Sequence, residues 1–412
     1  MIVDILQLPP EVIEGIGHRL EPPENRKLRL VCQQIRQAIE PQAFETLYLT
    51  KRDLPWLLKR LEAYGSQTTR VGLFVKTLVI HIPTTGQETG MGRLKELFQR
   101  AIFSLRNVKA LSWISGDLDP PWIVNILLAH IHSIVMEHFQ VYINYGHTNF
   151  GAFKNIQNLR SFSFRSWPFT DAKDMSYASQ IILNSPRLSN LKISTSCYTA
   201  TSTAPRLHDF LPPRGCDPLP LETLALECLR ILLDDITLPH FRSLKYLRIR
   251  NNLVNPEFGS TYTQIWDTLR QESIHLTTID CNLGIVEEGL MAYLMSYQGT
   301  KSLEFDSEHQ WYDSKKADVV AHRFFLEVVP KICQSLERLI VNTHISNGWC
   351  FSEETSEAFK SCKRLRELQV SIDVVGNETT ESFEKVASGL KFLEKRTSRE
   401  AIPWVDPWSK KR

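Results

Sequence analysis

The chain has 412 residues, of which 42% are hydrophobic, and its 48 Lys and Arg against 46 Asp and Glu leave a formal net charge of +2. This apolar fraction is sufficient for a large core and excludes a globally disordered protein. The near balance of charge gives no general attraction to nucleic acid or to a membrane surface. The length predicts two to three domains or one elongated array of repeats.

The eight cysteines and the N-terminal residues indicate the compartment. No two cysteines form a Cys-x-x-Cys pair, and this usage fits a reducing compartment better than a disulfide framework. Asp4 interrupts the N-terminus before any apolar run, so no signal peptide is predicted. The longest apolar stretch, residues 122–136, is broken by polar residues and predicts no membrane span. We therefore expect a soluble protein of the cytoplasm, the nucleus or both.

Residues 6–49 predict a small helical module ahead of everything that looks repetitive. Pro9 and Pro10 suit the first turn of a helix, where a missing amide hydrogen costs nothing. Apolar residues then recur at helical spacing in two stripes, Val12, Ile13, Ile16 and Leu20, and, beyond Pro22 and Pro23, Leu28, Val31, Cys32, Ile35 and Ile39. Pro41 is expected to end the second helix, and residues 44–49 to form a short strand. A module of this size is too small to bury a self-sufficient core, so its stripes need a partner.

The run Leu8-Pro9-x-Glu11, Ile16, Leu20, Leu28-Arg29-Leu30-Val31-Cys32 and Ile35-Arg36 resembles an F-box of the kind common in fungal proteins. The resemblance covers residues 6 to about 45 and implies a three-helix fold that docks on the Skp adaptor of a cullin–RING ubiquitin ligase. It places seven residues in the packing or at the adaptor: Leu8, Pro9, Ile16, Leu20, Leu28, Val31 and Cys32. Two positions depart from the family, since Asn25 stands where an apolar residue is usual and Ile35 where a large aromatic is common. The alternative is that these helices only cap the first repeat of an array.

A pattern of the form apolar-x-x-apolar-x-apolar returns along the rest of the chain, most clearly at residues 244–249 (LKYLRI). Its twelve copies start at Phe44, Val75, Val108, Ile131, Leu159, Leu188, Leu221, Leu244, Leu276, Thr300, Leu336 and Leu365. The mean spacing of about 29 residues matches the upper range of leucine-rich repeat lengths. The last three positions of each copy alternate between inward and outward, as expected for a short half-buried strand.

Helical periodicity separates many of these strands. The segments are residues 92–102, 122–130, 262–272, 286–297, 317–333, 355–362 and 379–393. Strand, turn and helix in repetition predict parallel strands on one face and helices on the other. Helices are wider than the spacing of strands, so we expect an α/β solenoid arc with the strands concave and the helices convex. The full prediction is a three-helix F-box at 1–45, an irregular leucine-rich-repeat-like solenoid at 46–400 and a C-terminal tail at 401–412.

The similarity to leucine-rich repeats is loose, because the asparagine that follows the strand in that family occurs convincingly only once, at Asn252. Three loops interrupt the rhythm, at residues 83–91, 194–220 and 306–316. Loops of such length are usually functional or disordered. We expect disorder in the Ser- and Thr-rich residues 194–205, and expect Trp311 and Tyr312 to pack on a neighbouring repeat, with an exposed anchor for a partner as the alternative.

The open strand face predicts where a target protein binds. If the fourth and sixth positions of each pattern point into the core, the third, fifth and seventh point to the open face. The charged and aromatic residues selected in this way as target-binding are Arg165, Lys192, Tyr246, Arg248, Arg250, Asp280, Glu304 and Asp306. The middle strands are basic and the next two acidic, and we interpret the segregation as charges left unpaired between strands. This interpretation predicts a target with an acidic or phosphorylated stretch over Arg248 and Arg250 and basic residues beside Glu304. An ordinary solvated polar face is the alternative.

No catalytic residues, metal ligands or cofactor site are predicted. Gly86, Gly90 and Gly92 are not followed by the Lys-Ser/Thr of a phosphate loop. His130, His132 and His138 lack the spacing and thiolate partners of a zinc site, so satisfied or exposed histidines are expected.

The favoured function is therefore non-enzymatic: a substrate-recognition subunit of a Skp–cullin–F-box ubiquitin ligase that binds the Skp adaptor and an unknown target protein. No contact with nucleic acid or a membrane is expected. A repeat scaffold without a ubiquitin-ligase role is the alternative, and an enzyme or RNA binder is disfavoured by the missing motifs and the neutral charge.

Overall fold

The computed structural model describes residues 8–20, 22–50, 59, 61–63, 71–81, 91–115, 120–144, 149–167, 172–195, 205–250, 256–282, 286–307, 314–343, 347–373 and 395–401. It divides into two compact units, residues 1–188 and 189–412. Several predictions lie outside the described residues: the helix at 379–393, the order of residues 196–204, the loop up to residue 90, and the packing of Trp311 and Tyr312.

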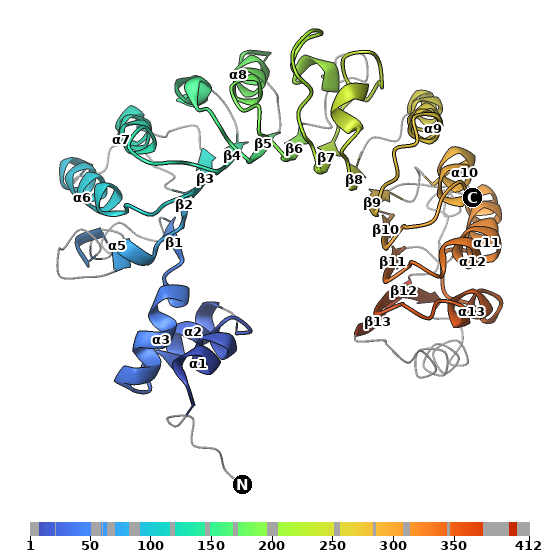
Figure 1. The fold of residues 1–412 in the computed structure, drawn as a ribbon, viewed down its shortest axis with the longest axis horizontal. Helices are drawn as coiled ribbons and strands as arrows, with labels where there is room; N and C mark the ends of the chain where they lie inside the picture. Colours follow the sequence, from blue (N-terminus) through green and yellow to red (C-terminus); the bar gives the residue numbers. More distant parts are fainter. Residues whose placement is uncertain are drawn as a thin grey trace, which may run out of the picture. The chain divides into compact units, whose positions relative to one another are not determined.

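The first unit begins with three helices, α1(Pro10–Gly17), α2(Pro22–Leu28) and α3(Gln33–Ala43), followed by strands that pair in parallel with their sequence neighbours. The strands are β1(Thr46–Thr50), β2(Thr77–His81), β3(Ala110–Ser115), β4(His138–Asn144) and β5(Ser161–Trp167). The segments between and after them hold α5(Val71–Phe74), α6(Met91–Ser104), α7(Pro121–Ile131), the 3-10 helix η2(Asn149–Asn155) and α8(Ala172–Leu183). In Figure 1 α6, α7 and α8 lie on one side of these strands.

The second unit continues the same alternation of parallel strand and helix. Its strands are β6(Asn190–Ser194), β7(Thr223–Glu227), β8(Tyr246–Arg250), β9(Thr278–Asn282), β10(Ser302–Asp306), β11(Arg338–Asn342), β12(Glu367–Asp373) and β13(Lys395–Ala401). Its helical segments are η4(Leu207–Asp209), η5(Leu238–Phe241), α9(Pro256–Gln271), α10(Glu288–Met295), α11(Ser314–Arg323), the π-helical turn η7(Phe324–Val328), α12(Val329–Ile332) and α13(Glu353–Lys360). The prediction of an α/β repeat with parallel strands is confirmed.

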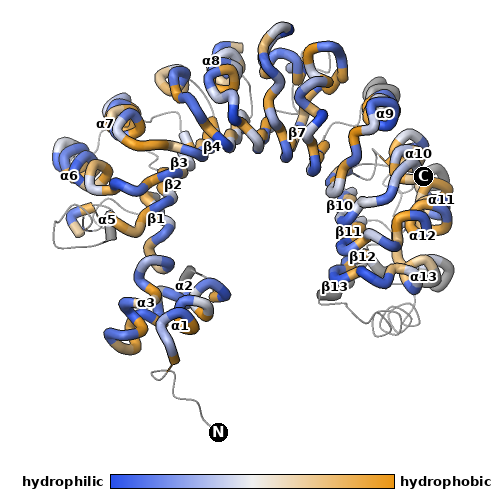
Figure 2. Tube along the Cα trace, viewed as in Figure 1, coloured by the Kyte–Doolittle hydropathy of each residue, from blue (hydrophilic) through white to orange (hydrophobic). Residues whose placement is uncertain are grey.

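In strands such as β2, β8 and β10, buried and half-buried residues alternate because one face packs on the helices and the other is open. In β7, β9 and β11, residues on both faces are buried. In β8, Leu247 and Ile249 are buried, whereas Tyr246, Arg248 and Arg250 are half-buried. Figure 2 shows the corresponding alternation of hydrophobic and hydrophilic residues along the strands. The core of the second unit includes Trp266 and Tyr293, whose rings lie 5.6 Å apart between α9 and α10. On β8, β9 and β10 this arrangement leaves a row of polar side chains on the open face.

Eleven of the twelve predicted strand positions coincide with a strand, which begins at the third residue of the pattern. The exception is the copy at Ile131, because Ile131 is the last residue of α7. The strand of that repeat, β4, begins at His138, and its apolar residues are Met136, Phe139 and Val141. The prediction at Ile131 was wrong because its apolar spacing also suits the end of a helix.

The N-terminal module also differs from its predicted form. The second predicted helix is two helices, because the chain turns at residues 29–32 and Cys32 caps α3 with its sulfur, which accepts the Ile35 amide hydrogen at 3.5 Å. Pro41 lies inside α3 and does not end it. A proline is tolerated there because it lies in the last turn, where only one helical hydrogen bond is lost.

The described part of the long predicted loop at 194–220 is only partly packed, since several apolar residues are buried whereas residues 213–218 are exposed. Leu207, Phe210 and Leu219 are buried, and the Leu219 amide donates to Nδ1 of the buried His240 at 2.8 Å. Cys32, Cys216, Cys281, Cys333, Cys350 and Cys362 are free thiols. Cys228, in contrast, is disulfide-bonded, which differs from the reducing compartment expected from the cysteine spacing. Among the described residues, no helix is both long enough and apolar enough to cross a membrane.

Candidate functional site

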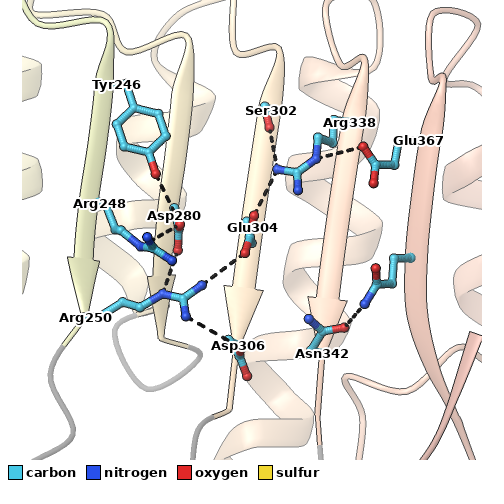
Figure 3. A network of polar contacts seen from close by, with 11 residues as sticks. Tyr246, Arg248, Arg250, Asp280, Ser302, Glu304, Asp306, Arg338, Asn342 and Glu367 are labelled. Carbon is cyan, nitrogen blue, oxygen red and sulfur yellow. Dashed lines mark hydrogen bonds and ion pairs between the residues drawn. The ribbon is translucent and has the colours of Figure 1, made fainter. Parts of the chain in front are cut away.

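The open strand face of the second unit carries a continuous network of charged side chains from β8 to β12 (Figure 3). Tyr246, Arg248 and Arg250 come from β8, Asp280 from β9, Glu304 and Asp306 from β10, Arg338 from β11 and Glu367 from β12. The parallel register sets Arg248 beside Asp280 and Asp280 beside Glu304. All six residues that we selected from these strands therefore lie on one face.

Asp280 is the first centre of the network. Its carboxylate lies 2.9 Å from Nε of Arg248 and accepts a hydrogen bond from Nε of Arg250 at 3.0 Å. The Tyr246 hydroxyl donates to the same carboxylate at 3.3 Å. Asp280 is only 5% exposed, and its burial raises its pKa, although the two arginines act in the opposite direction. Burial also raises the pKa of Tyr246 to about 12, so the phenol keeps its proton at neutral pH.

Glu304 is the second centre and joins two arginines. It accepts from Nη2 of Arg250 at 3.0 Å and from Nη1 of Arg338 at 2.9 Å. Arg338 continues the chain to Glu367, whose carboxylate accepts from Nε at 2.9 Å. Asp306 is held less closely, with its carboxylate 3.8 Å from Nη1 of Arg250. A single arginine side chain thus bridges two or three neighbouring strands.

These contacts correct our interpretation of the charges as unpaired. Arg248 and Arg250 do pair with the acidic residues of the neighbouring strands, because the arginine side chain is long enough to cross the roughly 4.8 Å between strands. The grouping of basic residues on β8 and acidic residues on β9 and β10 therefore reflects pairing between strands. Arg338 and Glu367, which complete the network, were not selected from the sequence, although both occupy the third position of their patterns.

The other two predicted target-binding residues have different surroundings. Lys192 on β6 lies 3.9 Å from the carboxylate of Glu227 on β7, which also accepts from the Ser194 hydroxyl at 2.6 Å. Arg165 on β5 belongs to the first unit and is exposed, with its guanidinium 5.0 Å from the centre of the Tyr142 ring. Within the described residues, neither side chain has a hydrogen bond or ion pair with the network of β8–β12.

The three N-terminal helices form a module with a small core of Ile13, Ile35, Ala38, Ile39 and Ala43. Side-chain amides tie the end of α1 to the other two helices. The buried Asn25 donates from Nδ2 to the Gly17 carbonyl at 2.8 Å, and Gln42 donates from Nε2 to the Glu14 carbonyl at 3.0 Å. A Cβ on Gly17 would lie 2.1 Å from Oε1 of Gln42, so a larger residue there would displace this side chain. Asn25 thus satisfies a carbonyl at the end of α1 by a hydrogen bond.

The seven predicted adaptor-binding residues fall into two groups. Leu8, Leu28 and Cys32 are half-buried and pack on the module core, and Ile16 and Leu20 are also half-buried. Pro9 is exposed, and Val31 is 62% exposed. Two further apolar side chains that we did not select are exposed, Val12 at 44% and Leu30 at 75%. Leu30 lies in the turn after α2, and Val12 lies off the buried side of α1. The apolar pattern of the sequence alone does not distinguish these exposed residues from the buried ones.

The histidines named in the sequence analysis form no metal site in the part of the chain that the structure describes, where no group of three His, Cys, Asp or Glu residues could hold a metal ion. His130 is buried on α7, and neither ring nitrogen has a hydrogen-bond partner. Burial lowers its pKa, and its ring packs edge-on against Phe103 at 5.9 Å. His130 is therefore a neutral core residue.

Comparisons with known proteins add little to this geometry. No family model matches the sequence, and no curated protein is similar to it. Among solved structures, one protein from Bacteroides fragilis is 10% identical, with 84% of this chain and 71% of that chain covered and a TM-score of 0.27. A similarity this low carries no argument about either fold or function. The assignment of a parallel α/β repeat rests on the observed strands and helices.

Proposed function

We propose that the chain is the substrate-recognition subunit of a Skp–cullin–F-box ubiquitin ligase. The N-terminal module docks on the Skp adaptor, the open strand face holds a target protein, and the chain itself performs no chemistry. The observation that carries the proposal is the exposure of Val12, Leu30 and Val31 on a module that has its own core. Exposed apolar side chains on a small module, two of them adjacent in sequence, fit a surface that a partner covers.

The energetics agree with a partner of substantial apolar area. Fully burying a Val or Leu side chain contributes roughly 1.5–3 kcal/mol. Leu30 and Val31 are both largely exposed and adjacent, so covering the pair supplies about 3 kcal/mol or more, close to 150-fold in affinity. The half-buried Leu8, Ile16, Leu20, Leu28 and Cys32 act in this proposal mainly by holding the surface in shape, and Pro9 belongs to the exposed group.

The target-binding part of the proposal keeps Arg165, Lys192, Tyr246, Arg248, Arg250, Asp280, Glu304 and Asp306 and adds Arg338 and Glu367. Because Arg248 and Arg250 are already paired, an acidic or phosphorylated target segment has to compete with Asp280 and Glu304 for them. A target that supplies both an anion and a cation replaces both halves of such a pair. We therefore expect a target segment of mixed charge rather than a purely acidic one.

Co-purification of the full chain with a purified Skp adaptor tests the docking surface. The double variant Leu30→Asp with Val31→Asp changes exposed side chains and should leave the fold intact while weakening adaptor binding by about 100-fold. Val319→Asp on α11 is the matched control, because Val319 is as exposed as Val31 and lies outside the module. Undiminished binding by the double variant would reject the F-box assignment and favour the plain repeat scaffold.

A further inference from the structure

A cleft of about 580 Å³ opens in the first unit where the N-terminal helices meet the first repeats. One wall comes from α1 and α3, with Glu14, His18 and Gln42, and the other from α5 and from the turns that lead into β2, β3 and β4. The exposed apolar residues Val12, Leu30 and Val31 do not line it. The cleft is therefore a separate site, independent of the proposed adaptor surface, and its volume is within the range of ligand-binding pockets.

The repeat side of the cleft presents apolar side chains that the chain leaves uncovered. Leu73 on α5 is 54% exposed, and Val135, in the turn after α7, is 79% exposed. Phe74 is half-buried beside them and Val108 is buried. Side chains of this size gain from contact with an apolar group of a ligand.

Three permanent cations line the same side. Lys76 and Lys109 occupy neighbouring strand starts, and the Lys109 amide donates to the Lys76 carbonyl at 2.8 Å. Their ammonium groups lie 3.0 Å from Glu45 and 2.9 Å from Glu137, but these side chains are substantially exposed and such pairs exchange easily with other carboxylates. Arg106, in the turn before β3, is exposed and makes no hydrogen bond or ion pair within the described residues.

The charges of the other wall do not cancel this excess. The carboxylates that line the cleft are Glu14 and Glu45, and Glu45 is already engaged by Lys76. Arg106 thus lies as an unengaged cation next to an uncovered apolar strip, with Lys109 beside it paired only to Glu137, and Glu14 is the single unengaged carboxylate on the opposite wall. His18, at the end of α1, completes the ionisable groups of the cleft.

We propose that this cleft binds an acidic, apolar peptide segment of a partner protein, with Leu or Phe side chains on Leu73 and Val135 and Asp or Glu carboxylates on Arg106 and Lys109. The apolar strip suits the apolar side chains of such a segment, and the adjacent cations suit its carboxylates. A bound segment contacts α1 and α3 together with the first repeats.

Fluorescence anisotropy with labelled hexapeptides tests the proposal on the full chain. One set alternates Asp or Glu with Leu or Phe, and a second set replaces the acids with Lys. The acidic set should bind and the basic set should not, and Arg106→Glu with Lys109→Glu should weaken the acidic set at least tenfold, as should Val135→Asp. Arg187→Glu is the matched control, since Arg187 is exposed in the corresponding turn before β6 and lies outside the cleft.

Failure of the acidic set to bind at about 1 mM would overturn the proposal. Binding that the cleft variants leave unchanged, a preference for the basic set, or full displacement by inorganic phosphate alone would overturn it as well. The variant Leu30→Asp with Val31→Asp should keep peptide binding. The result for the cleft is thereby distinguishable from the result for the adaptor surface.

Discussion

Replacement of Arg250 by Met tests whether the strand-face network stabilises the second unit. The arginine is 11% exposed and lies 3.0 Å from Asp280, 3.0 Å from Glu304 and 3.8 Å from Asp306. Methionine keeps much of the side-chain stem but removes the charge, so carboxylates on β9 and β10 lose their common partner. Removing one member of a buried ion pair costs 3–5 kcal/mol. We expect about 3 kcal/mol, the lower end, because Asp280 keeps Arg248 and Glu304 keeps Arg338.

The pH dependence of this loss gives a second test. In the native protein burial already raises the pKa of Asp280 above its ordinary value, and removal of Arg250 raises it further. A carboxyl with a raised folded-state pKa binds more protons when folded, so stability falls as the pH rises from the unfolded pKa through the folded one. The stability lost in Arg250→Met should therefore be smaller near pH 4 than at pH 7.5. The change develops between the ordinary pKa of an Asp carboxyl and the raised pKa of Asp280.

Urea unfolding at both pH values measures the loss, and hydrogen exchange of the β8–β10 amides at pH 7.5 locates it. Arg338→Met is the control, because Arg338 is 36% exposed and the loss should stay near 1 kcal/mol or less. The reasoning is refuted if both variants lose the same stability, if Arg250→Met costs less than about 1 kcal/mol, or if its cost grows on acidification.

Two further substitutions probe the repeat and the N-terminal module. Leu247→Asp places an unpaired carboxylate in the core beneath β8 and should lower the free energy of unfolding by several kcal/mol. Protection from hydrogen exchange should be lost first in β7–β9 and kept in β1–β4. A uniform loss of protection along the described strands would contradict a repeat held by contacts between neighbours. Asn25→Leu removes the buried hydrogen bond to the Gly17 carbonyl and should cost about 1–3 kcal/mol of stability. The loss should appear as faster hydrogen exchange of the α1 amides. Unchanged protection of α1 would show that the Asn25 amide contributes nothing.

The repeat could be predicted from the sequence because the buried positions of each strand are fixed by its alternation. The apolar residue that precedes each strand and the two within it suffice to place β8 at Tyr246–Arg250. The same spacing fails at Ile131, since apolar residues three apart also suit a helix, and α7 runs directly into that segment. Periodicity alone cannot tell the end of one element from the start of the next.

The N-terminal module shows a similar limit. The stripe from Leu28 to Ile39 is continuous at helical spacing, yet the chain breaks between α2 and α3. The break depends on Cys32 acting as a cap through its sulfur, and cysteine is not among the usual capping residues.

The strand face shows what a sequence pattern leaves undecided about a site. Alternation determines which side chains share the face, and it correctly gathered Arg248, Arg250 and Asp280. It does not determine how far a side chain reaches, and the guanidinium of Arg250 contacts Glu304, 54 positions along the chain and two strands away. Charges of one sign on neighbouring strands are therefore as consistent with internal pairing as with a vacant binding patch.

Internal pairing changes what the face can recognise. A target that merely adds charge must first separate Arg250 from Asp280 and Glu304, and the desolvated carboxylates left behind oppose binding. A target that brings its own paired charges can exchange partners without leaving any group unpaired, which favours selection of one arrangement over general attraction. If a target binds as proposed, such an exchange should begin at least cost at Arg338, because at 36% its side chain is the most exposed of the three arginines. Target capture by a mixed-charge segment should accordingly be more sensitive to Arg338→Glu than to a change of net charge elsewhere on the unit.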